Sequence, residues 1–374
     1  MKTIKLNPYL LTVPLYVGGK PIEEVQEEYG LTNVIKLGSN ENPLGPSPLA
    51  IAALQGALQN AHRYPGVADK HLRQKLATFY NAHDGASFDE HNFLTGNGLG
   101  DVLRMIAHAL LFDGGEAIYC DPTFPLYPIY TKMLGATAVS VPHNNYKYDL
   151  KTIAETINAR TRVIFICNPN NPTGTVVTRD DVAALMARVP DSVVVVFDES
   201  YFDFVEDREY SNSIEYVKGG HDNVLVLRGF SKIYGMANLR VGYAIGTHAM
   251  IEYLAHAQIV FNTGDPVLCA AAAALDDQAH VQAARELIAR EREFLQRGFA
   301  DLDLSYVPSQ TNFILLTDLP RDVKVINEGM LRRGVIIRPM GGFGLPNAIR
   351  VTIGTREQNK KMLEALKEVL EEGK

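Results

Sequence analysis

Lys232 and Arg240 lie eight positions apart in a segment that begins at Arg228 and reads RGFSKIYGMANLR. The segment follows the apolar run Val224–Leu227, so the lysine lies in a turn rich in glycine and serine. A lysine in such a turn suits a Schiff base with an aldehyde, because its amine is accessible and partly desolvated. An arginine nearby can hold a phosphate through a fixed cation with several donors. Pyridoxal 5'-phosphate offers both groups and is therefore a candidate cofactor.

A glycine-rich turn, Leu94–Asp101, leads from an expected strand into an expected helix and reads LTGNGLGD. Its free backbone N–H groups and the helix dipole suit an anion. A rival interpretation is a dinucleotide-binding turn with Asp121 as the acid that binds a ribose. The glycine spacing is G-x-G-x-G, whereas that motif needs G-x-G-x-x-G, so we expect phosphate binding of another kind.

Two further polar groups follow buried strands. The loop Asn168–Gly174 reads NPNNPTG and is dense enough in Asn, Pro and Gly to be fixed, and Asn171 can donate to a phenolate oxygen. Asp198 follows the apolar run Val193–Phe197, where burial of a carboxylate requires a cationic partner such as a protonated pyridine nitrogen. A helix cap or a surface ion pair is the alternative role for Asp198. Tyr201 could reach the same ring oxygen as Asn171.

Two side chains are more ambiguous when each is taken alone. Phe124 could stack on a planar heterocycle or anchor its loop in the core. Arg350 begins an expected strand and could clamp a substrate carboxylate, although an outward-facing arginine is common there. What favours a shared site is the order of these residues, because most of them lie at successive strand ends, where ligands bind to such sheets.

The elements that must position these residues alternate between strand and helix patterns from about residue 91 to residue 245. Continuous apolar runs such as Ile164–Cys167 are typical of strands buried on both faces of a mainly parallel sheet. Strands separated by helices predict an α/β sandwich with right-handed crossovers. The predicted strands are 91–95, 116–120, 137–141, 162–167, 192–197, 224–227 and 239–245, with helices at 98–111, 126–134, 150–158 and 180–188.

The chain of 374 residues is long enough for more than one domain. Residues 1–45 are punctuated by proline and glycine, and we expect an extended N-terminal arm. Residues 46–265 are expected to form the large α/β domain. Near Pro266 the pattern changes to a long helix, expected over 267–299, and then to short strands between helices. Residues 266–374 are therefore predicted to form a smaller α+β domain.

Composition excludes several classes of function. The net charge of −7 leaves no basic stripe for nucleic acid or an anionic membrane surface. The three cysteines are widely separated, and no pair has the spacing of metal ligands, so we expect neither a metal site nor a disulfide framework. The first residues lack the features of a signal peptide, and no stretch reaches the ~18 apolar residues that a membrane span needs. Cytoplasmic localisation is the expectation.

On these residues the sequence resembles the fold-type I PLP-dependent aminotransferases, and within them the histidinol-phosphate aminotransferase branch. The resemblance covers nearly the whole chain, from the segments YVGGKPIEEV at Tyr16 and SNENPLGP at Ser39 to RVTIGT at Arg350. NPNNPTG and SKIYG are its most specific motifs. It implies a homodimer that transfers the amino group of a small-molecule donor, L-histidinol phosphate, to a 2-oxo acid, 2-oxoglutarate, in a ping-pong cycle of histidine biosynthesis.

The resemblance also assigns roles around the cofactor ring. It implies that Lys232 forms the internal aldimine and moves the substrate's Cα proton, while Asp198 pairs with the pyridine nitrogen. Asn171 and Tyr201 would hold the ring oxygen, and Phe124 would stack on the ring. By the same resemblance, the cofactor phosphate would be held by Ser231, Arg240, the backbone of Leu99 and Gly100, and Tyr64 of the partner subunit. The substrate would be bound by Arg350, with Tyr16, Asn171 and Arg338 nearby.

Three places depart from the family's pattern. Leu99 stands where Ser or Ala is usual and Gly229 where Thr is usual, which removes two hydroxyls near the phosphate and predicts loose cofactor retention. The segment Phe261–Pro266 reads FNTGDP and also differs from the usual form. An aromatic or specialised-metabolism amino acid aminotransferase and a related decarboxylase therefore remain alternatives of the same fold. A non-catalytic PLP-binding protein and a nicotinamide dehydrogenase are alternatives of other classes.

Overall fold

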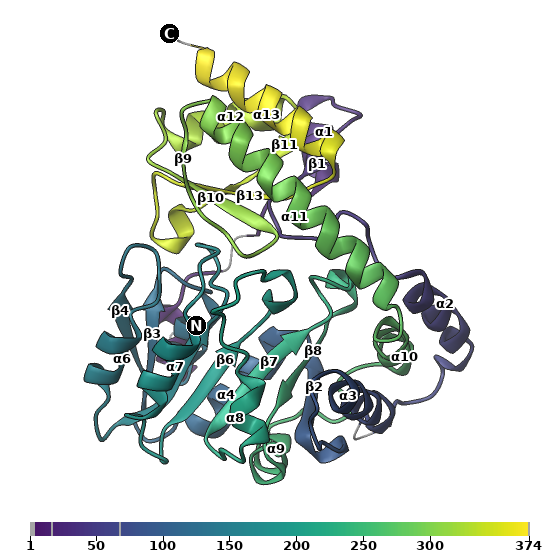
Figure 1. The fold of residues 1–374 in the computed structure, drawn as a ribbon, viewed down its shortest axis with the longest axis vertical. Helices are drawn as coiled ribbons and strands as arrows, with labels where there is room; N and C mark the ends of the chain where they lie inside the picture. The colour runs from purple at the N-terminus through teal and green to yellow at the C-terminus, as the bar shows by residue number, and fades with distance from the viewer. Residues whose placement is uncertain (1–3, 16–17, 67–68, 373–374) are drawn as a thin grey trace.

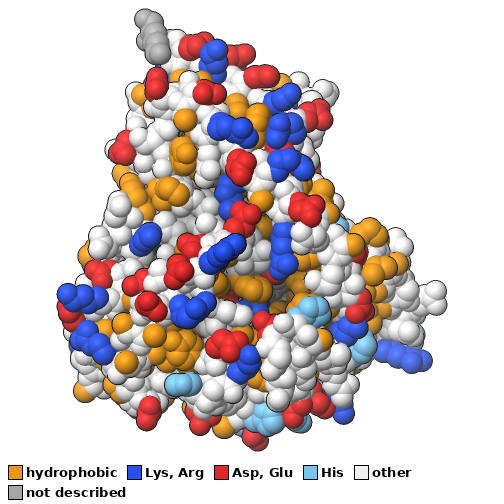
Figure 2. All heavy atoms as spheres, viewed as in Figure 1, with side chains coloured by type: hydrophobic (Ala, Val, Ile, Leu, Met, Phe, Trp, Pro, Cys, Tyr) orange, Lys and Arg blue, Asp and Glu red, His pale blue; other side chains and the backbone are white. Residues whose placement is uncertain are grey.

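The computed structural model describes residues 4–15, 18–66 and 69–372. Figure 1 shows two layered parts, a larger one around a broad sheet and a smaller one above it, joined by the long helix α11 (Gln278–Asp301). In the face drawn in Figure 2, acidic and basic side chains are intermingled over both parts.

Within the described residues the largest sheet has seven strands, in the order β2-β8-β7-β6-β5-β3-β4. Neighbours are parallel from β4 to β7, whereas β8 runs antiparallel to both β7 and β2. The mainly parallel sheet predicted from the sequence is therefore confirmed. The strands are β2 (Phe93–Asn97), β3 (Glu116–Asp121), β4 (Thr137–Pro142), β5 (Thr161–Cys167), β6 (Val194–Asp198), β7 (Val224–Gly229) and β8 (Val241–Ile245).

Helices cover this sheet because each presents an apolar stripe to it. Helix α4 contacts β2, β7 and β8, α5 contacts β3 and β4, and α6 contacts β3. The helices of the larger part are α2 (Pro48–Ala57), α3 (Lys70–His83), α4 (Leu99–Leu110), α5 (Leu126–Met133), α6 (Leu150–Thr156), α7 (Arg179–Met186), α8 (Ile214–Lys218), α9 (His248–Ala255) and α10 (Asp265–Ala274). Short 3-10 helices are η1 (Pro8–Thr12), η2 (Leu58–Asn60), η3 (Glu90–Asn92), η4 (Phe202–Phe204), η5 (Ala237–Leu239) and η6 (Gly341–Phe343).

The smaller part contains an antiparallel sheet in the order β12-β13-β10-β9. Its elements are β9 (Ser305–Val307), β10 (Phe313–Thr317), α12 (Val323–Arg332), β11 (Val335–Ile336), β12 (Arg338–Pro339), β13 (Ile349–Thr352) and α13 (Arg356–Glu371). The N-terminal segment joins this part, because β1 (Ile35–Lys36) pairs in parallel with β11 and α1 (Ile22–Tyr29) contacts α12. Helix α1 was not expected from the sequence, and it forms because Val25 packs against Leu331 and Ile336.

The single helix expected over 267–299 is wrong. Helix α10 ends at Ala274, and α11 starts after a cap at Asp277, whose side chain accepts a hydrogen bond from the His280 N–H. The Ser47 hydroxyl donates to the same carboxylate at 2.6 Å and so ties this break to the start of α2. Helix α10 packs against α2 and α3, while α11 leads toward the smaller part. The expected domain boundary at residue 265 stays a prediction.

Three further expectations concern sites and surroundings. No helix in the described ranges has the length and apolarity to cross a membrane. The same ranges contain no cluster of three or more His, Cys, Asp or Glu side chains that could hold a metal ion. Cys120, Cys167 and Cys269 are all free thiols. Cytoplasmic localisation stays a prediction.

Candidate active site

A cavity of about 300 Å³ lies where β5, β6 and β7 end, between the larger sheet, the loop after β1 and the sheet of the smaller part. Of the residues predicted from the sequence, those that line it are Leu99, Gly100, Phe124, Asn171, Asp198, Tyr201, Ser231, Lys232, Arg240, Arg338 and Arg350. Tyr64 does not line it: this side chain is 79% exposed and stacks on the ring of Phe261. Tyr16 lies outside the described residues.

Lys232 follows β7, in the turn that the apolar strand leads into. Its Nζ donates to the backbone carbonyl oxygens of Ser39 and Asn40, each 3.2 Å away. Burial, together with the positive charge of Arg350, lowers the pKa of this amine to about 7. A neutral amine is the nucleophilic form, so Lys232 can attack an aldehyde near neutral pH.

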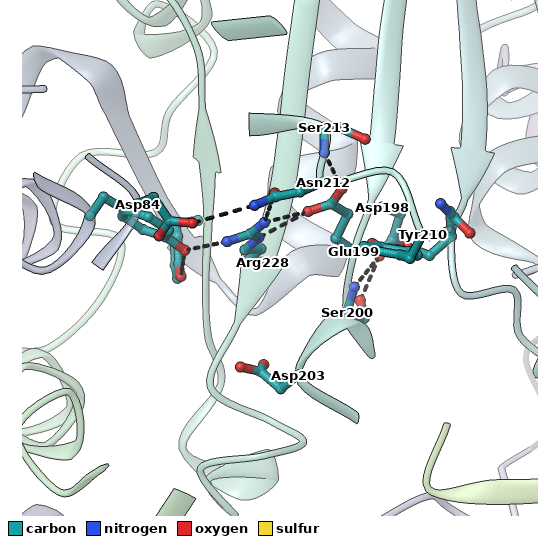
Figure 3. Close-up of polar contacts among 12 residues, drawn as sticks. Asp84, Asp198, Glu199, Ser200, Asp203, Tyr210, Asn212, Ser213 and Arg228 are labelled. Carbon is teal, nitrogen blue, oxygen red and sulfur yellow. Dashed lines mark hydrogen bonds and ion pairs between the residues drawn. The ribbon is translucent and has the colours of Figure 1, made fainter. Parts of the chain in front are cut away.

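Asp198 is the last residue of β6 and is buried opposite Cys167 of β5. Its Oδ2 accepts a hydrogen bond from the Tyr127 hydroxyl at 2.8 Å. Its Oδ1 accepts from the backbone N–H and hydroxyl of Ser200, at 3.1 and 2.5 Å (Figure 3). Burial raises the pKa of this carboxyl, and no Lys, Arg or His of the described residues forms an ion pair with it. The site thus contains a buried acidic group that can receive a cation.

An ion pair beside Asp198 holds the ends of β6 and β7 together. Arg228 donates from Nε and Nη2 to Glu199 Oε2, at 3.0 and 2.7 Å, and from Nη2 to Asn212 at 2.7 Å (Figure 3). Both charged side chains are buried, and the guanidinium lies 3.6 Å from the Phe202 ring centroid. Sequence reasoning missed this pair, although both residues adjoin the motifs of the site. This buried and hydrogen-bonded ion pair fixes the ends of β6 and β7 relative to each other.

The N-terminus of α4 and Arg240 form a cradle for an anion. Gly98, the N-cap residue, has φ +75°, and a side chain there would collide with the Arg240 guanidinium, so glycine permits this approach. Arg240 donates to the Ala237 carbonyl oxygen at 3.0 Å, and no acidic side chain in the described ranges pairs with it. Free helix N–H groups beside an arginine suit a phosphate.

One wall of this cradle is apolar. A Cβ built on Gly242 would lie 2.9 Å from the Leu99 Cγ, and one built on Gly229 would lie 3.5 Å from it. Leu99 therefore fills space that the two glycines leave open on β7 and β8. The absence of hydroxyls at Leu99 and Gly229, noted in the sequence, reflects tight apolar packing between these elements.

Two arginines line the cavity from the smaller part. Arg350 on β13 is buried, hydrogen-bonds to Asn171 Oδ1, and donates to the Gly38 carbonyl oxygen at 3.0 Å. Its guanidinium lies 5.1 Å from the Phe313 ring centroid. Arg338 is the register partner of Arg350 across the β12–β13 pair. Two adjacent cations favour ligands with more than one negative charge.

Residues of the loop after β1 also belong to the cavity and were not assigned a role from the sequence. Gly38, Ser39, Asn40 and Glu41 line it. Asn40 is 1% exposed and donates from its side-chain amide to the Tyr201 hydroxyl at 3.0 Å. The sequence signal available was the run of Asn, Pro and Gly around it, which indicates an ordered loop but not its partners.

Comparison with known proteins agrees with this geometry. The sequence pattern of the family "Aminotransferase class I and II" matches residues 32–366. The histidinol-phosphate aminotransferase of Moorella thermoacetica is 43% identical over 98% of this chain and 93% of its own length. That of Brevibacillus brevis is 42% identical over 96% of this chain and 97% of its own.

Solved structures show the same fold. A histidinol-phosphate aminotransferase from Sinorhizobium meliloti, in complex with pyridoxal-5'-phosphate, superposes with a TM-score of 0.88 at 24% identity, over 98% of this chain and 97% of that one. An aspartate aminotransferase from Thermus thermophilus superposes with a TM-score of 0.84 at 24% identity, over 98% of this chain and 100% of its own.

Proposed function

Because the chain belongs to the aminotransferase class I and II family, we propose that it is a PLP-dependent aminotransferase that transfers the amino group of L-histidinol phosphate to 2-oxoglutarate. Relatives that carry the histidinol-phosphate aminotransferase name are more than 40% identical over nearly the whole chain, which supports this donor. The observation that carries the proposal is that Lys232, whose pKa burial lowers to about 7, lines the same cavity as the buried Asp198.

The residues present fit pyridoxal 5'-phosphate. Asp198 is a buried carboxylate without a cationic partner among the described residues, which suits a protonated pyridine nitrogen. The cradle of Gly98, Arg240 and the α4 N-terminus suits the phosphate, with Ser231 beside it. When bound, the cofactor supplies an electron sink for the carbanion at the substrate's Cα. We assign its ring stacking to Phe124.

Each residue of the site has a separate role in the proposed reaction. Lys232 would accept the substrate's Cα proton on its amine and transfer it to the cofactor's C4' carbon, a task for which a pKa near neutrality is suited. Asp198 keeps the pyridine nitrogen protonated, and Asn171 and Tyr201 donate to the ring oxygen. Arg350, with Arg338 beside it, binds the anionic groups of both substrates, the phosphate of the donor and the carboxylates of the acceptor.

We further propose that the active form is a homodimer with shared sites. Ile259 and Val260 are 58% and 65% exposed and adjoin Phe261, on which the exposed Tyr64 ring stacks. Apolar side chains exposed together are typical of a surface covered by a partner. In this arrangement Tyr64 reaches the cofactor phosphate of the partner subunit.

The test is a half-reaction without any oxo acid. Cofactor-loaded protein is mixed with L-histidinol phosphate, and the absorption band of the bound cofactor is followed, with phenylalanine and tyrosine in parallel. We expect conversion to the pyridoxamine form with histidinol phosphate and none in Lys232→Ala. Conversion only with the aromatic amino acids would overturn the proposed donor. Release of carbon dioxide from phenylalanine or tyrosine would indicate a decarboxylase. No band and no conversion would contradict the catalytic assignment.

A further inference from the structure

Asn40 lies where three parts of the cavity meet. Its side-chain nitrogen is 3.0 Å from the Tyr201 hydroxyl, and its carbonyl oxygen is 3.2 Å from the Lys232 Nζ. The same carbonyl oxygen accepts from the Asn312 amide at 3.1 Å. A single buried loop residue thus contacts the phenol, the reactive amine and the smaller part of the molecule.

The direction of the hydrogen bond between Asn40 and Tyr201 follows from Thr352. The backbone N–H of Asn40 donates to Thr352 Oγ1 at 2.9 Å, so the one proton of that hydroxyl is available to Asn40 Oδ1, 3.2 Å away. With Oδ1 on this side, the Nδ2 of Asn40 faces Tyr201 and donates to it. The phenol oxygen is an acceptor here, and its own proton points elsewhere.

Because the Tyr201 oxygen accepts a hydrogen bond from Asn40, the proton of the Tyr201 hydroxyl can point into the cavity. Among the described residues the hydroxyl has no second hydrogen-bond partner, and the side chain lines the cavity together with Asn171. A buried hydroxyl normally donates to something, so a ligand atom in the cavity is the natural acceptor. The amine of Lys232 is held at the same loop, by the carbonyl oxygens of Ser39 and Asn40.

We propose that Asn40 is a positioning residue, whose amide directs the Tyr201 proton toward the ring oxygen of the cofactor and whose carbonyl gives the free Lys232 amine a fixed place. The inference rests on the proposed function, in which Tyr201 and Lys232 contact the cofactor. Thr352 lies on β13, which also carries Arg350. Anion binding by the smaller part and orientation of the phenol therefore depend on one loop.

Two substitutions at this position preserve the backbone. Asn40 has φ +56°, a conformation that glycine and aspartate tolerate better than alanine. Asn40→Gly removes the amide and keeps the carbonyl contact to Lys232. Asn40→Asp replaces the donor with an acceptor, so the Tyr201 proton turns away from the cofactor.

The readout is the pH midpoint at which the absorption spectrum of the bound cofactor changes. The charged groups that face Lys232 are Arg350, Arg240, Glu41 and Asp198, and they stay the same in all variants. A new carboxylate holds the proton on the lysine nitrogen to higher pH, so Asn40→Asp should raise the midpoint by about one unit or more. Asn40→Gly should raise it less.

Coupling and a control separate positioning from general loosening. In the Tyr201→Phe background, Asn40→Gly should add no further shift, because the phenol it orients is gone. Asn42→Ala alters the same loop, where Asn42 donates to the Ile233 carbonyl oxygen at 2.7 Å, and should leave the midpoint unchanged. Shifts of Asn40→Gly and Tyr201→Phe that simply add would overturn the proposal.

A second measurement uses the cofactor-free protein. Modification of Lys232 by an amine-reactive reagent is followed by mass spectrometry across pH, with a midpoint near 7 expected for the unmodified sequence. The midpoint should rise in Asn40→Asp and stay unchanged in Asn42→Ala. If the protein takes up no cofactor at all, the proposed function fails, whereas an unshifted lysine midpoint in Asn40→Asp contradicts the role of Asn40.

Discussion

Asp198 is a buried carboxylate whose hydrogen-bond partners, Tyr127 and Ser200, are all uncharged. Burial raises its pKa, which means that the folded protein without cofactor bears a cost for keeping this group ionised. For a carboxyl with a raised pKa in the folded state, this cost is present above the unfolded pKa, and therefore at neutral pH. A cation in the cavity would offset it.

Asp198→Asn should therefore have opposite effects on two properties. The cofactor-free variant should melt at the same or a higher temperature, because a buried charge is removed and the Tyr127 hydroxyl can reverse its hydrogen bond. The affinity for pyridoxal 5'-phosphate should fall by roughly a hundredfold, because the charged partner of the pyridine nitrogen is lost. Calorimetric melting and cofactor titration measure the two effects. An unchanged affinity would remove Asp198 from the site.

At the scale of elements, the join between α4, β7 and β8 determines the polarity of the phosphate cradle. Leu99, the first residue of α4, packs where Gly229 of β7 and Gly242 of β8 leave space. Helix and sheet approach closely here because neither glycine has a side chain. As a result, this wall of the cradle is apolar, and it lacks a hydroxyl that could donate a hydrogen bond to a bound anion.

Leu99→Ser should tighten cofactor binding by about tenfold, because a hydroxyl at the start of α4 adds a hydrogen bond to a charged group. Leu99→Ala is the matched control, since it loses similar packing volume without gaining a donor. The dissociation constant of the cofactor, measured by titration of the cofactor-free protein, compares the two. Equal affinities of the two variants would show that the wall does not face the phosphate.

At the scale of the whole molecule, the question is which sites a dimer would share. Dimers in which both subunits carry Lys232→Ala should be poorly active, and so should dimers in which both subunits carry Tyr64→Ala. If Tyr64 acts on the partner's cofactor, a mixed dimer has one site with both defects and one intact site. Random mixing should then restore about a quarter of full activity, because half the dimers are mixed and each has one good site. No restoration would place Tyr64 in its own subunit's site or outside any site.

Much of this protein was determined by the sequence alone. The family and the fold class predicted from the residues are confirmed, by the family match and by the solved structures of the same fold. The reason is local: Asp198 ends an apolar strand, and Asn171 and Lys232 lie in the loops that follow two neighbouring strands, so strand order brings them to one edge of the sheet. The sequence close to each of these residues was therefore enough to predict its place in the fold.

Tertiary structure decided the rest, because the deciding contacts join distant segments. Asn40 meets Thr352 across 312 positions and Tyr201 across 161, and no local pattern indicates either partner. The break between α10 and α11 depends on Ser47, which lies 230 positions from Asp277. Periodicity and spacing report which face of an element is buried, whereas the partner of a loop residue depends on how the two parts of the molecule pack together.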